Sequence, residues 1–263
     1  MEVREFEEAI NMEYENLNDD EHILKMWTPF KVNIDENYKF VSNNIIFKIA
    51  SNLLYFVAYI VVFLINKIFF GFKVNGIKNL WGVEGGKITV SNHIHPMDCT
   101  MNALLNCPNK TYFTTIKSNF EIPVIRWIIK LLNAIPIPET ISGKMAFYNA
   151  IDEILQNGKT VHFYPEASMR PYCNKIRKFK NGAFKFAVKN NTPIVPVVYT
   201  YAEPSGIRKI FKKKPFINAN ILPAIYPNTK IDEKTAVEEL KNEVWKSMNN
   251  VLINKLKVEE NEI

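Results

Sequence analysis

An uninterrupted apolar run near the N-terminus limits the folds open to this chain more than any other feature of the sequence. Between Lys48 and Lys67, the 18 consecutive residues from Ile49 to Asn66 carry no charge. As a helix this run would be about 27 Å long, close to the roughly 30 Å hydrocarbon core of a bilayer. Such a helix could cross a bilayer, lie embedded in one leaflet, or form the core of a soluble domain. We expect contact with a membrane phospholipid surface, because a run of this length is rarely buried whole in a domain of this size.

Charge is distributed unevenly on the two sides of this run. Residues 1–44 contain 4 basic and 11 acidic side chains, whereas the rest of the chain contains 29 basic and 16 acidic ones. We therefore expect three parts: an acidic N-terminal segment (1–44), an apolar membrane-associating helix (45–72) and one main domain (73–263). The excess of basic side chains in the main domain favours polyanionic partners such as phosphate groups or anionic lipid.

Cysteine usage and the first residues bear on the compartment. The three cysteines, Cys99, Cys107 and Cys173, are an odd number without a CxxC pair, so neither a disulfide framework nor a zinc site is indicated. A reducing compartment fits this usage best. Met1 is followed by acidic sequence, which is not the pattern of a signal peptide. We expect membrane association, with the main domain on the cytoplasmic side.

From residue 72 onward, segments typical of strands and helices alternate, which predicts an α/β domain with a mixed central sheet flanked by helices. β-branched and aromatic runs mark the strands, and apolar residues at helical spacing mark the helices. The expected strands are 88–90, 111–117, a short Pro-bounded segment after 132, a segment from 160 that ends before Pro165, 193–201 and 217–221. The expected helices are 97–106, 122–132, 144–156, one within 175–191, and 234–257.

The stretch KITVSNHIHPMD, from Lys87 to Asp98, contains the first candidate site. It begins as a β-branched strand, and a polar pair and a proline then end that strand. Pro96 suits the first position of a helix, so His95 is expected as the N-cap and Asp98 in the first turn. His93 would then lie in the turn before the helix. There its side chain can converge with that of Asp98. Within one helix, two residues five positions apart would not face each other.

A histidine held by a carboxylate is the arrangement of a general base, in which Asp98 would fix the tautomer of His93 and support its imidazolium form. Two other interpretations stay open. His93 could be a surface histidine, with Asp98 a complement to the helix dipole. His93 and His95 could instead form an HxH metal pair in a hydrolase. That site needs further ligands, and only His22 and His162 remain, the latter within a strand and therefore expected in the core.

A second candidate patch follows the strand that begins at residue 160. Glu166, Ser168 and Arg170 come directly after the expected strand end, and such a set could bind the hydroxyls and phosphate of an acceptor. An ordinary exit from strand to loop is the alternative. A run of basic side chains begins here and could meet an anionic headgroup or a carrier's phosphates, or form a solvated face. Its members are Arg170, Lys175, Arg177, Lys178, Lys180, Lys185 and Lys189.

Four sequence blocks occur in an order that resembles the glycerolipid acyltransferase family, whose bacterial member makes phosphatidate from 1-acyl-glycerol-3-phosphate. The blocks are Asn92-His93 with Asp98, similar to the family's NH-x4-D motif; Lys117 with AIPI at 134–137; 163–170, similar to its FPEG-type block; and TPIVPVVY at 192–199, similar to its proline-containing block. The resemblance covers about residues 73–224, somewhat over half of the chain.

The resemblance implies a membrane-associated O-acyltransferase. In that chemistry His93 removes the proton from the acceptor's free hydroxyl, which attacks an acyl thioester, while Asp98 orients His93. The residues expected to position the acceptor are Lys117, Glu166, Ser168 and Arg170. The implied partners are a lysophospholipid acceptor, most directly 1-acyl-glycerol-3-phosphate, and acyl-CoA or acyl carrier protein as the thioester donor. No metal or other cofactor is implied.

The chain departs from the family pattern at three places. Ala167 stands where the third block usually has glycine, and Arg170 follows Glu166 by four residues instead of three. The second block often has an arginine after its strand, where this chain has PET at 138–140. These departures leave the acceptor open, so another lyso-lipid or glycerol phosphate could take the place of 1-acyl-glycerol-3-phosphate.

A non-catalytic basic protein that binds membrane or nucleic acid is the remaining alternative. The sequence contains no signature of a nucleic-acid-binding fold, so we expect no nucleic-acid partner. Such a protein would also leave the ordered blocks unexplained.

Overall fold

The computed structural model describes residue 14, residues 27–204 and residues 215–261, so most of the acidic segment expected at 1–44 lies outside the described residues. The strands are β1 (Lys73–Asn75), β2 (Lys87–Ser91), β3 (Thr111–Ile116), β4 (Ala134–Ile137), β5 (Thr160–Phe163), β6 (Ile194–Ala202) and β7 (Phe216–Ile221). They form one seven-stranded sheet with the order β1-β7-β6-β2-β5-β3-β4. Neighbours run parallel except β6 and β7, which are antiparallel, so the expected mixed sheet is confirmed.

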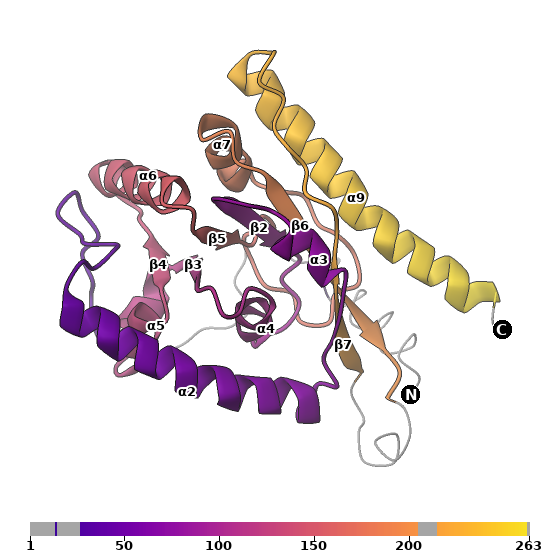
Figure 1. The fold of residues 1–263 in the computed structure, drawn as a ribbon, viewed down its shortest axis with the longest axis horizontal. Coiled ribbons are helices and arrows are strands. Elements are labelled where there is room, and N and C mark those ends of the chain that lie inside the picture. Colours follow the sequence, from indigo (N-terminus) through magenta and orange to yellow (C-terminus); the bar gives the residue numbers. More distant parts are fainter. Residues whose placement is uncertain (1–13, 15–26, 205–214, 262–263) are drawn as a thin grey trace.

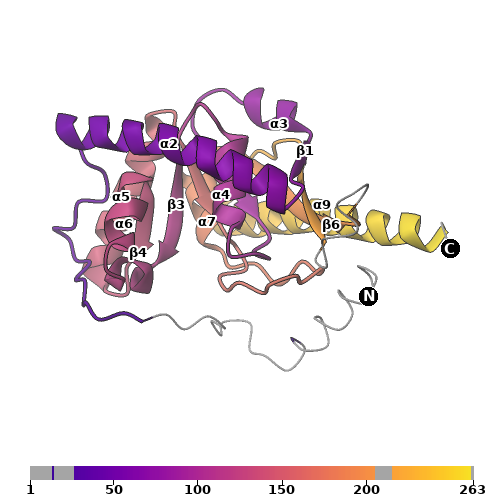
Figure 2. The ribbon, with the colours of Figure 1, turned by 90° about the horizontal axis from the view of Figure 1, so that it is seen from below.

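Helices cover both faces of this sheet (Figure 1). They are α2 (Ile45–Phe69), α3 (Ile77–Trp81), α4 (Asp98–Leu105), α5 (Ile125–Leu131), α6 (Ile141–Gln156), α7 (Gly182–Lys189) and α9 (Glu233–Asn261), with a short 3-10 helix at Lys117–Glu121. α6, α7 and α9 share one core cluster with the sheet, and α3 and α4 share a second cluster on the opposite face. α2 packs outside α4 and α5 (Figure 2). The expected α/β class is therefore confirmed.

The alternation of side chains along the central strands separates an apolar face of the sheet from a polar one. Ile88 and Val90 of β2 belong to the core cluster that includes α6 and α7. Thr89 and Ser91 point to the opposite face, where both meet His162 of β5. Polar groups are therefore buried between the sheet and α4, directly behind the end of β2.

The pairing of β2 with β5 brings two of the sequence blocks together. Val90 lies opposite Phe163 in this parallel pair, so the segments that leave the two strands start side by side. His93 follows the end of β2, and Glu166 follows the end of β5. In parallel α/β sheets, binding sites form beyond the carboxyl ends of the strands. The first and third blocks meet at such an edge.

Two differences from the expected elements have a physical reason. α4 begins at Asp98 with Met97 as its N-cap, instead of beginning at Pro96 with His95 as the cap. The His95 ring accepts the backbone N–H of Met97 and its carbonyl accepts that of Asp98, so these residues form a separate turn before the helix. β1 and α3 are missing from the expected elements because pieces of three and five residues are too short to show a periodicity.

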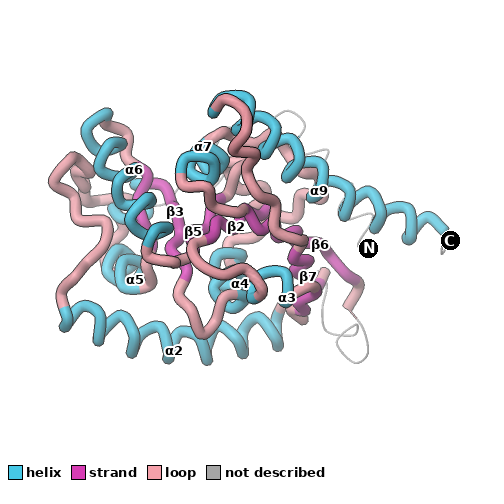
Figure 3. Tube along the Cα trace, turned by 45° about the horizontal axis from the view of Figure 1, so that its top comes forward, coloured by secondary structure: helices cyan, strands magenta, loops and turns pink. Residues whose placement is uncertain are grey.

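α2 is long and apolar enough to cross a membrane, by length and composition alone. Only 6% of the most apolar 18-residue stretch of this helix is buried, so the interpretation as a core helix is wrong. Polar side chains fasten its inner face to the domain: Ser51 Oγ donates to the carbonyl of Leu131 at 2.6 Å, and Asn66 Nδ2 donates to Thr100 Oγ1 at 3.1 Å. The helix therefore runs along the domain for most of its length (Figure 3).

Candidate active site

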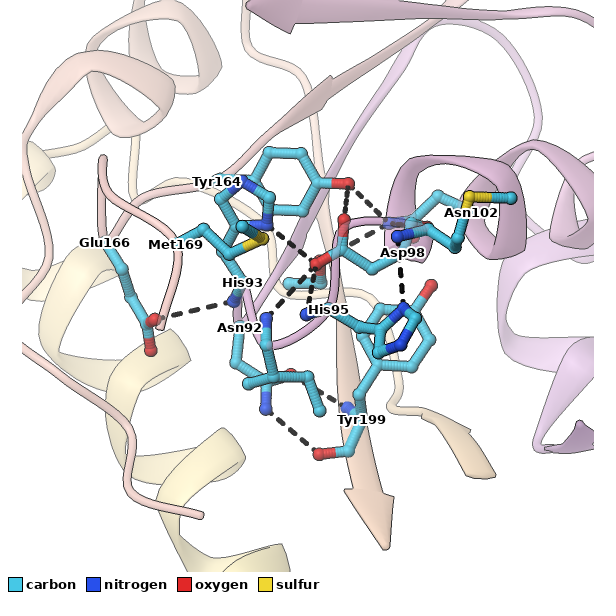
Figure 4. Close-up of polar contacts among 12 residues, drawn as sticks. Asn92, His93, His95, Asp98, Asn102, Tyr164, Glu166, Met169 and Tyr199 are labelled. Atoms are coloured by element: carbon cyan, nitrogen blue, oxygen red, sulfur yellow. Dashed lines mark hydrogen bonds and ion pairs between the residues drawn. The ribbon is translucent and has the colours of Figure 1, made fainter. Parts of the chain in front are cut away.

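The side chains of His93 and Asp98 converge beyond the carboxyl end of β2, as expected (Figure 4). His93 Nδ1 lies 2.7 Å from Asp98 Oδ2. Asp98 is buried in the first turn of α4, whereas 22% of the His93 side chain remains exposed. Because Nδ1 is held by Asp98, Nε2 is the ring nitrogen left to meet a substrate. The predicted pairing is confirmed, and the catalytic role of both residues stays a prediction.

The Asp98 carboxylate also shapes the turn that carries His93. Besides the imidazole, Asp98 Oδ2 accepts the backbone N–H of Ile94 at 3.1 Å and that of His95 at 3.3 Å. The same oxygen therefore fixes the backbone of the turn and the tautomer of the ring that the turn presents.

Asn92 and His95, which lie before and after His93 in the chain, both form hydrogen bonds to backbone groups. The buried Asn92 amide exchanges two hydrogen bonds with the backbone of Tyr199 on β6, at 2.8 and 3.0 Å. The His95 ring accepts the N–H of Met97 and packs edge-on against Phe70, with ring centroids 4.7 Å apart. His95 is thus engaged in contacts within the fold.

Tyr164 is a member of this site that sequence reasoning missed. Its ring stacks on the His93 imidazole, with centroids 3.9 Å and planes 18° apart, and its hydroxyl donates to Asp98 Oδ1 at 2.8 Å (Figure 4). Burial and the Asp98 charge raise the pKa of Tyr164 well above its usual value, so the hydroxyl keeps its proton. The signal in the sequence is a tyrosine where the FPEG-type block has phenylalanine.

A buried polar network continues behind Asp98. His162 Nδ1 lies 2.9 Å from Thr89 Oγ1, and its Nε2 lies 3.2 Å from Asn102 Nδ2. Burial lowers the pKa of His162 to about 3, so this ring is neutral at physiological pH. Asn102 Nδ2 also lies 3.4 Å from the Tyr164 hydroxyl. The expectation that His162 belongs to the core is confirmed.

Glu166 and Arg177 form a largely buried ion pair in the loop that follows β5. Arg177 Nη2 lies 2.9 Å from Glu166 Oε2, and the two side chains are 12% and 2% exposed. Glu166 also accepts the backbone N–H of Arg177 at 3.1 Å and that of His93 at 3.4 Å. Arg177 in turn donates to the hydroxyl and the carbonyl of Ser168. Glu166 thereby bonds the loop to the His93 turn, whereas Ser168 bonds Arg177 within the loop. A contact of either with the acceptor stays a prediction.

The two predicted phosphate ligands, Arg170 and Lys117, lie outside the lining of the pocket described below. Arg170 is 2% exposed, and its Cζ lies 5.9 Å from the centre of the Tyr14 ring. Lys117 lies 2.8 Å from Glu139, and this hydrogen bond raises the pKa of Lys117. Their role toward an acceptor stays a prediction. Among the described residues, the cations that do line the pocket are Lys144 and Lys180.

Ala167 takes a backbone conformation that suits glycine. Its φ is +66°, in the left-handed region that costs an L-residue roughly 1–2 kcal/mol. The loop after it is bonded to the His93 turn: the His93 carbonyl accepts the N–H of Arg170 at 2.9 Å, and the Ile94 carbonyl accepts that of Tyr172 at 2.8 Å. A glycine at this position, as in the family pattern, would adopt the same φ without strain. The backbone here thus has a conformation that glycine adopts readily, although the residue is alanine.

An apolar pocket of about 970 Å³ opens beside the His93–Asp98 pair, and both residues line it. Part of its wall comes from α2, through Tyr55, Ala58, Tyr59 and Val62. Further apolar lining comes from Leu104, Ile116, Ile122, Ile125, Ile129, Leu132, Ile137, Phe147 and Phe186. The apolar helix and the domain thus enclose the pocket together. A pocket of this volume and lining suits a long hydrocarbon chain.

Fold and site define an α/β domain with a histidine–carboxylate pair beside an apolar pocket. Within the residues that the structure describes, no three His, Cys, Asp or Glu side chains gather as a metal site would require. The chemistry that this arrangement supports is proton removal from a hydroxyl group next to a bound lipid chain.

Known proteins are similar to this chain over parts of its length. Residues 71–200 match the Acyltransferase family. The chain is 28% identical over 135 residues to the "1-acyl-sn-glycerol-3-phosphate acyltransferase BAT2, chloroplastic" of Brassica napus, a match that covers 49% of this chain and 37% of that protein. Among solved structures it is similar to the 1-acyl-sn-glycerophosphate (LPA) acyltransferase PlsC from Thermotoga maritima, with a TM-score of 0.50, 18% identity and coverage of 78% of this chain and 97% of that one.

Residues 71–200 therefore form a domain of the acyltransferase family, and the family expected from the four blocks is confirmed. The match to PlsC supports the fold. The chain spans only 37% of the length of its curated relative.

Proposed function

We propose that this protein transfers a fatty acyl group from an acyl thioester to the free hydroxyl of a lysophospholipid, and that the acceptor is 1-acyl-glycerol-3-phosphate. The observation that carries the proposal is the position of His93, held by Asp98 at 2.7 Å on the wall of an apolar pocket of about 970 Å³. The Brassica napus relative is named for this acceptor, which supports the choice. The product would be phosphatidate.

The proposed reaction is a direct transfer between donor and acceptor. The acceptor hydroxyl gives its proton to Nε2 of His93 while its oxygen attacks the carbonyl carbon of the thioester. The carbonyl re-forms as the carbon–sulfur bond breaks, and the imidazolium gives the proton to the departing thiolate of acyl-CoA or acyl carrier protein. Asp98 stabilises the imidazolium while it carries the proton. Because the proton leaves with the thiolate, the base is restored after each turnover.

No acyl-enzyme forms in this proposal. Cys99 borders the pocket next to Asp98. Although the residue is open to the pocket, desolvation by the surrounding protein and the Asp98 charge raise the pKa of its thiol to about 12. A thiol with such a pKa contains almost no thiolate at neutral pH and is a poor nucleophile.

The phosphate of the acceptor requires fixed cations in place of its hydration shell. Arg170, with Lys117 assisting, is the pair that the family resemblance proposes. Arg170 is buried, so a phosphate reaches it only when the side chains that cover it move aside. Lys180 is a further candidate, because it lines the pocket and belongs to the same basic run.

Arg170→Ala should raise the apparent KM for lysophosphatidate about tenfold or more, which corresponds to about 1.4 kcal/mol for a charge-assisted contact. The KM for the acyl donor should hardly change. The assay is thiol release from acyl-CoA, or from acyl carrier protein, with lysophosphatidate, glycerol phosphate and a neutral lyso-lipid as acceptors. Lys185→Ala is the matched control, since it removes one charge of the same basic run from an exposed position on α7.

Two results would count against these assignments. Equal weakening toward the neutral lyso-lipid would mean that Arg170 supports the fold or the donor site instead of the phosphate. Absence of thiol release with every donor and acceptor in the panel would overturn the proposed reaction itself.

We also infer that α2 lies in the plane of the membrane surface, with the domain on the cytoplasmic side. Its inner face is bonded to the domain from Ser51 to Asn66, over about 22 Å of helix, and crossing a bilayer would break these contacts. Its outer face carries exposed apolar side chains at helical spacing, namely Ile46, Ile49, Leu53, Phe56, Val57, Ile60, Val61, Leu64 and Ile68. An apolar face of this kind suits the headgroup–acyl boundary of one leaflet.

Replacing Leu53 and Ile60 together by glutamate should weaken co-flotation with anionic vesicles about 100-fold or more. Each apolar side chain contributes about 1.5 kcal/mol or more when it is buried, and 1.4 kcal/mol corresponds to a factor of ten. Ile253→Glu, on the exposed surface of α9, is the matched control.

On sealed vesicles, an impermeant amine reagent added outside should modify both Lys48 and Lys67. Protection of one of them would identify a spanning helix, and unchanged flotation of the double variant would show that α2 does not bind the bilayer.

A further inference from the structure

The two oxygens of the Asp98 carboxylate have different partners. Oδ2 accepts the His93 ring and two backbone N–H groups. Oδ1 accepts the hydroxyl of Tyr164 at 2.8 Å. Asp98 is 1% exposed, so water does not take the place of these donors. The orientation of the carboxylate toward His93 therefore depends on a donor at each oxygen.

The direction of the Tyr164 hydrogen bond follows from its neighbours. Asn102 Nδ2 lies 3.4 Å from the Tyr164 oxygen and is a donor there. An ionised carboxylate can only accept, so the single hydroxyl proton of Tyr164 points to Asp98. Behind Asn102, the neutral ring of His162 and the hydroxyl of Thr89 extend the chain of polar groups into the sheet. This network keeps the hydroxyl in one orientation.

We propose that Tyr164 is a positioning residue of the His93–Asp98 pair, whose hydroxyl orients the Asp98 carboxylate and shares its negative charge. The proposal rests on the proposed acyl-transfer function. The stacked ring, at 3.9 Å from the imidazole, holds the plane of His93 as phenylalanine could. The hydroxyl adds what phenylalanine in the FPEG-type block cannot supply, a hydrogen bond to the second oxygen of the carboxylate.

Sharing of charge has a consequence for the base. Without the Tyr164 donor, more of the Asp98 charge is available to stabilise the imidazolium form of His93. The imidazolium then forms at higher pH and gives its proton less readily to the departing thiolate. A freed Oδ1 also allows the carboxylate to rotate, which disturbs the tautomer that Asp98 holds. Both effects act on turnover and leave substrate binding nearly unchanged.

Other titratable groups around His93 stay in place when only the Tyr164 hydroxyl is removed. They are Asp98 and Cys99 on α4, Glu166 with its partner Arg177 in the loop after β5, His162 on β5 and Tyr199 on β6. A change in the titration of His93 in the variant therefore reports the hydroxyl itself.

The test is Tyr164→Phe, which keeps the stacked ring and removes one oxygen. We expect kcat to fall about tenfold while the KM for each substrate stays within about twofold, and the acid limb of the pH–rate profile to move to higher pH. In NMR titrations without substrate, the ring signals of His93 should titrate about half a pH unit higher in the variant. The chain contains only 4 histidines, and His93→Gln identifies the signal. Tyr226→Phe, at an exposed position, is the matched control.

The titration arm needs no turnover, so it separates this proposal from the proposed reaction. A wild-type protein without transferase activity but with the expected shift in Tyr164→Phe would overturn the proposed reaction and support the role of Tyr164. A His93 titration that is the same in both proteins would overturn the role of Tyr164, and so would a change confined to KM. Thermal unfolding of the variant within a few degrees of the wild type makes the comparison valid, and the retained ring favours that result.

Discussion

His93→Ala should lower kcat/KM for acyl transfer about a thousandfold at neutral pH, while the protein remains folded. A positioned general base contributes about 10²–10⁴ to the rate, and Nε2 of His93 is the base proposed here. The acceptor hydroxyl would then have to lose its proton to water in an apolar pocket. The side chain of His93 is partly exposed and contributes little to the core, so thermal unfolding should change by only a few degrees.

The neighbouring histidine provides the control for this variant. His95→Ala removes an imidazole two positions away, and we expect it to retain most of kcat. Its cost should appear in stability, because the His95 ring packs against Phe70 and bonds the N–H of Met97. Loss of transfer in His95→Ala together with activity in His93→Ala would reverse the assignment. Loss of transfer in both variants would instead favour the alternative in which the HxH pair acts as a unit.

The pairing of His93 with Asp98 could be predicted because it is local. A strand that ends in a polar pair, followed by a proline, places a turn between the two residues, and their five-residue separation then suffices. Even here the helix begins later than expected, since the ring and carbonyl of His95 close a separate turn before Asp98. That closure depends on the rotamer of His95, which no sequence pattern specifies.

Tyr164 lies beyond the reach of local reasoning. It is separated from Asp98 by 66 positions, and its contact depends on β5 pairing with β2 in one register. A shift by one residue would send the Tyr164 side chain to the other side of the sheet. The tyrosine at the phenylalanine position of the third block was visible in the sequence, but only the register gives its hydroxyl a partner.

The apolar run illustrates a different limit. Its length and composition predicted a helix that contacts a membrane, and they left open whether the helix spans, embeds or packs as core. The structure excludes a core helix, since only 6% of the apolar stretch is buried. The polar residues that bond α2 to the domain, Ser51 and Asn66, have partners far along the chain, at Leu131 and Thr100. Sequence alone cannot assign such partners.

The second large effect is expected in stability: Glu166→Gln should lower the free energy of unfolding by about 3–5 kcal/mol. The substitution keeps the volume and removes the charge that compensates Arg177, which is 12% exposed. Leaving a buried charge without its partner is strongly destabilising. For a chain of this size the melting temperature should fall by about 6–12 °C or more. Thermal or urea unfolding measures both quantities.

Glu238→Gln is the matched control, because it makes the same chemical change at an exposed ion pair. Glu238 lies 2.6 Å from Lys241 on α9, and its side chain is 44% exposed. Solvent screens an exposed pair and its side chains lose freedom when they pair, so this variant should unfold close to the wild type. Equal losses in Glu166→Gln and Glu238→Gln would mean that burial of the Glu166–Arg177 pair is not what matters.

A double variant separates the ion pair from the other bonds of Arg177. Arg177→Met alone loses the hydrogen bonds to Ser168 and leaves Glu166 without its cation. Combined with Glu166→Gln, it removes both charges, so no uncompensated charge remains buried. We expect the double variant to lose about 1–3 kcal/mol less than the sum of the two single variants, the coupling typical of residues in one network. Strict additivity would contradict the pair as a unit and assign the stability of this loop to the Ser168 and backbone contacts. In that case the His93 turn would be held from the loop chiefly by the bonds that its carbonyl and that of Ile94 accept from Arg170 and Tyr172.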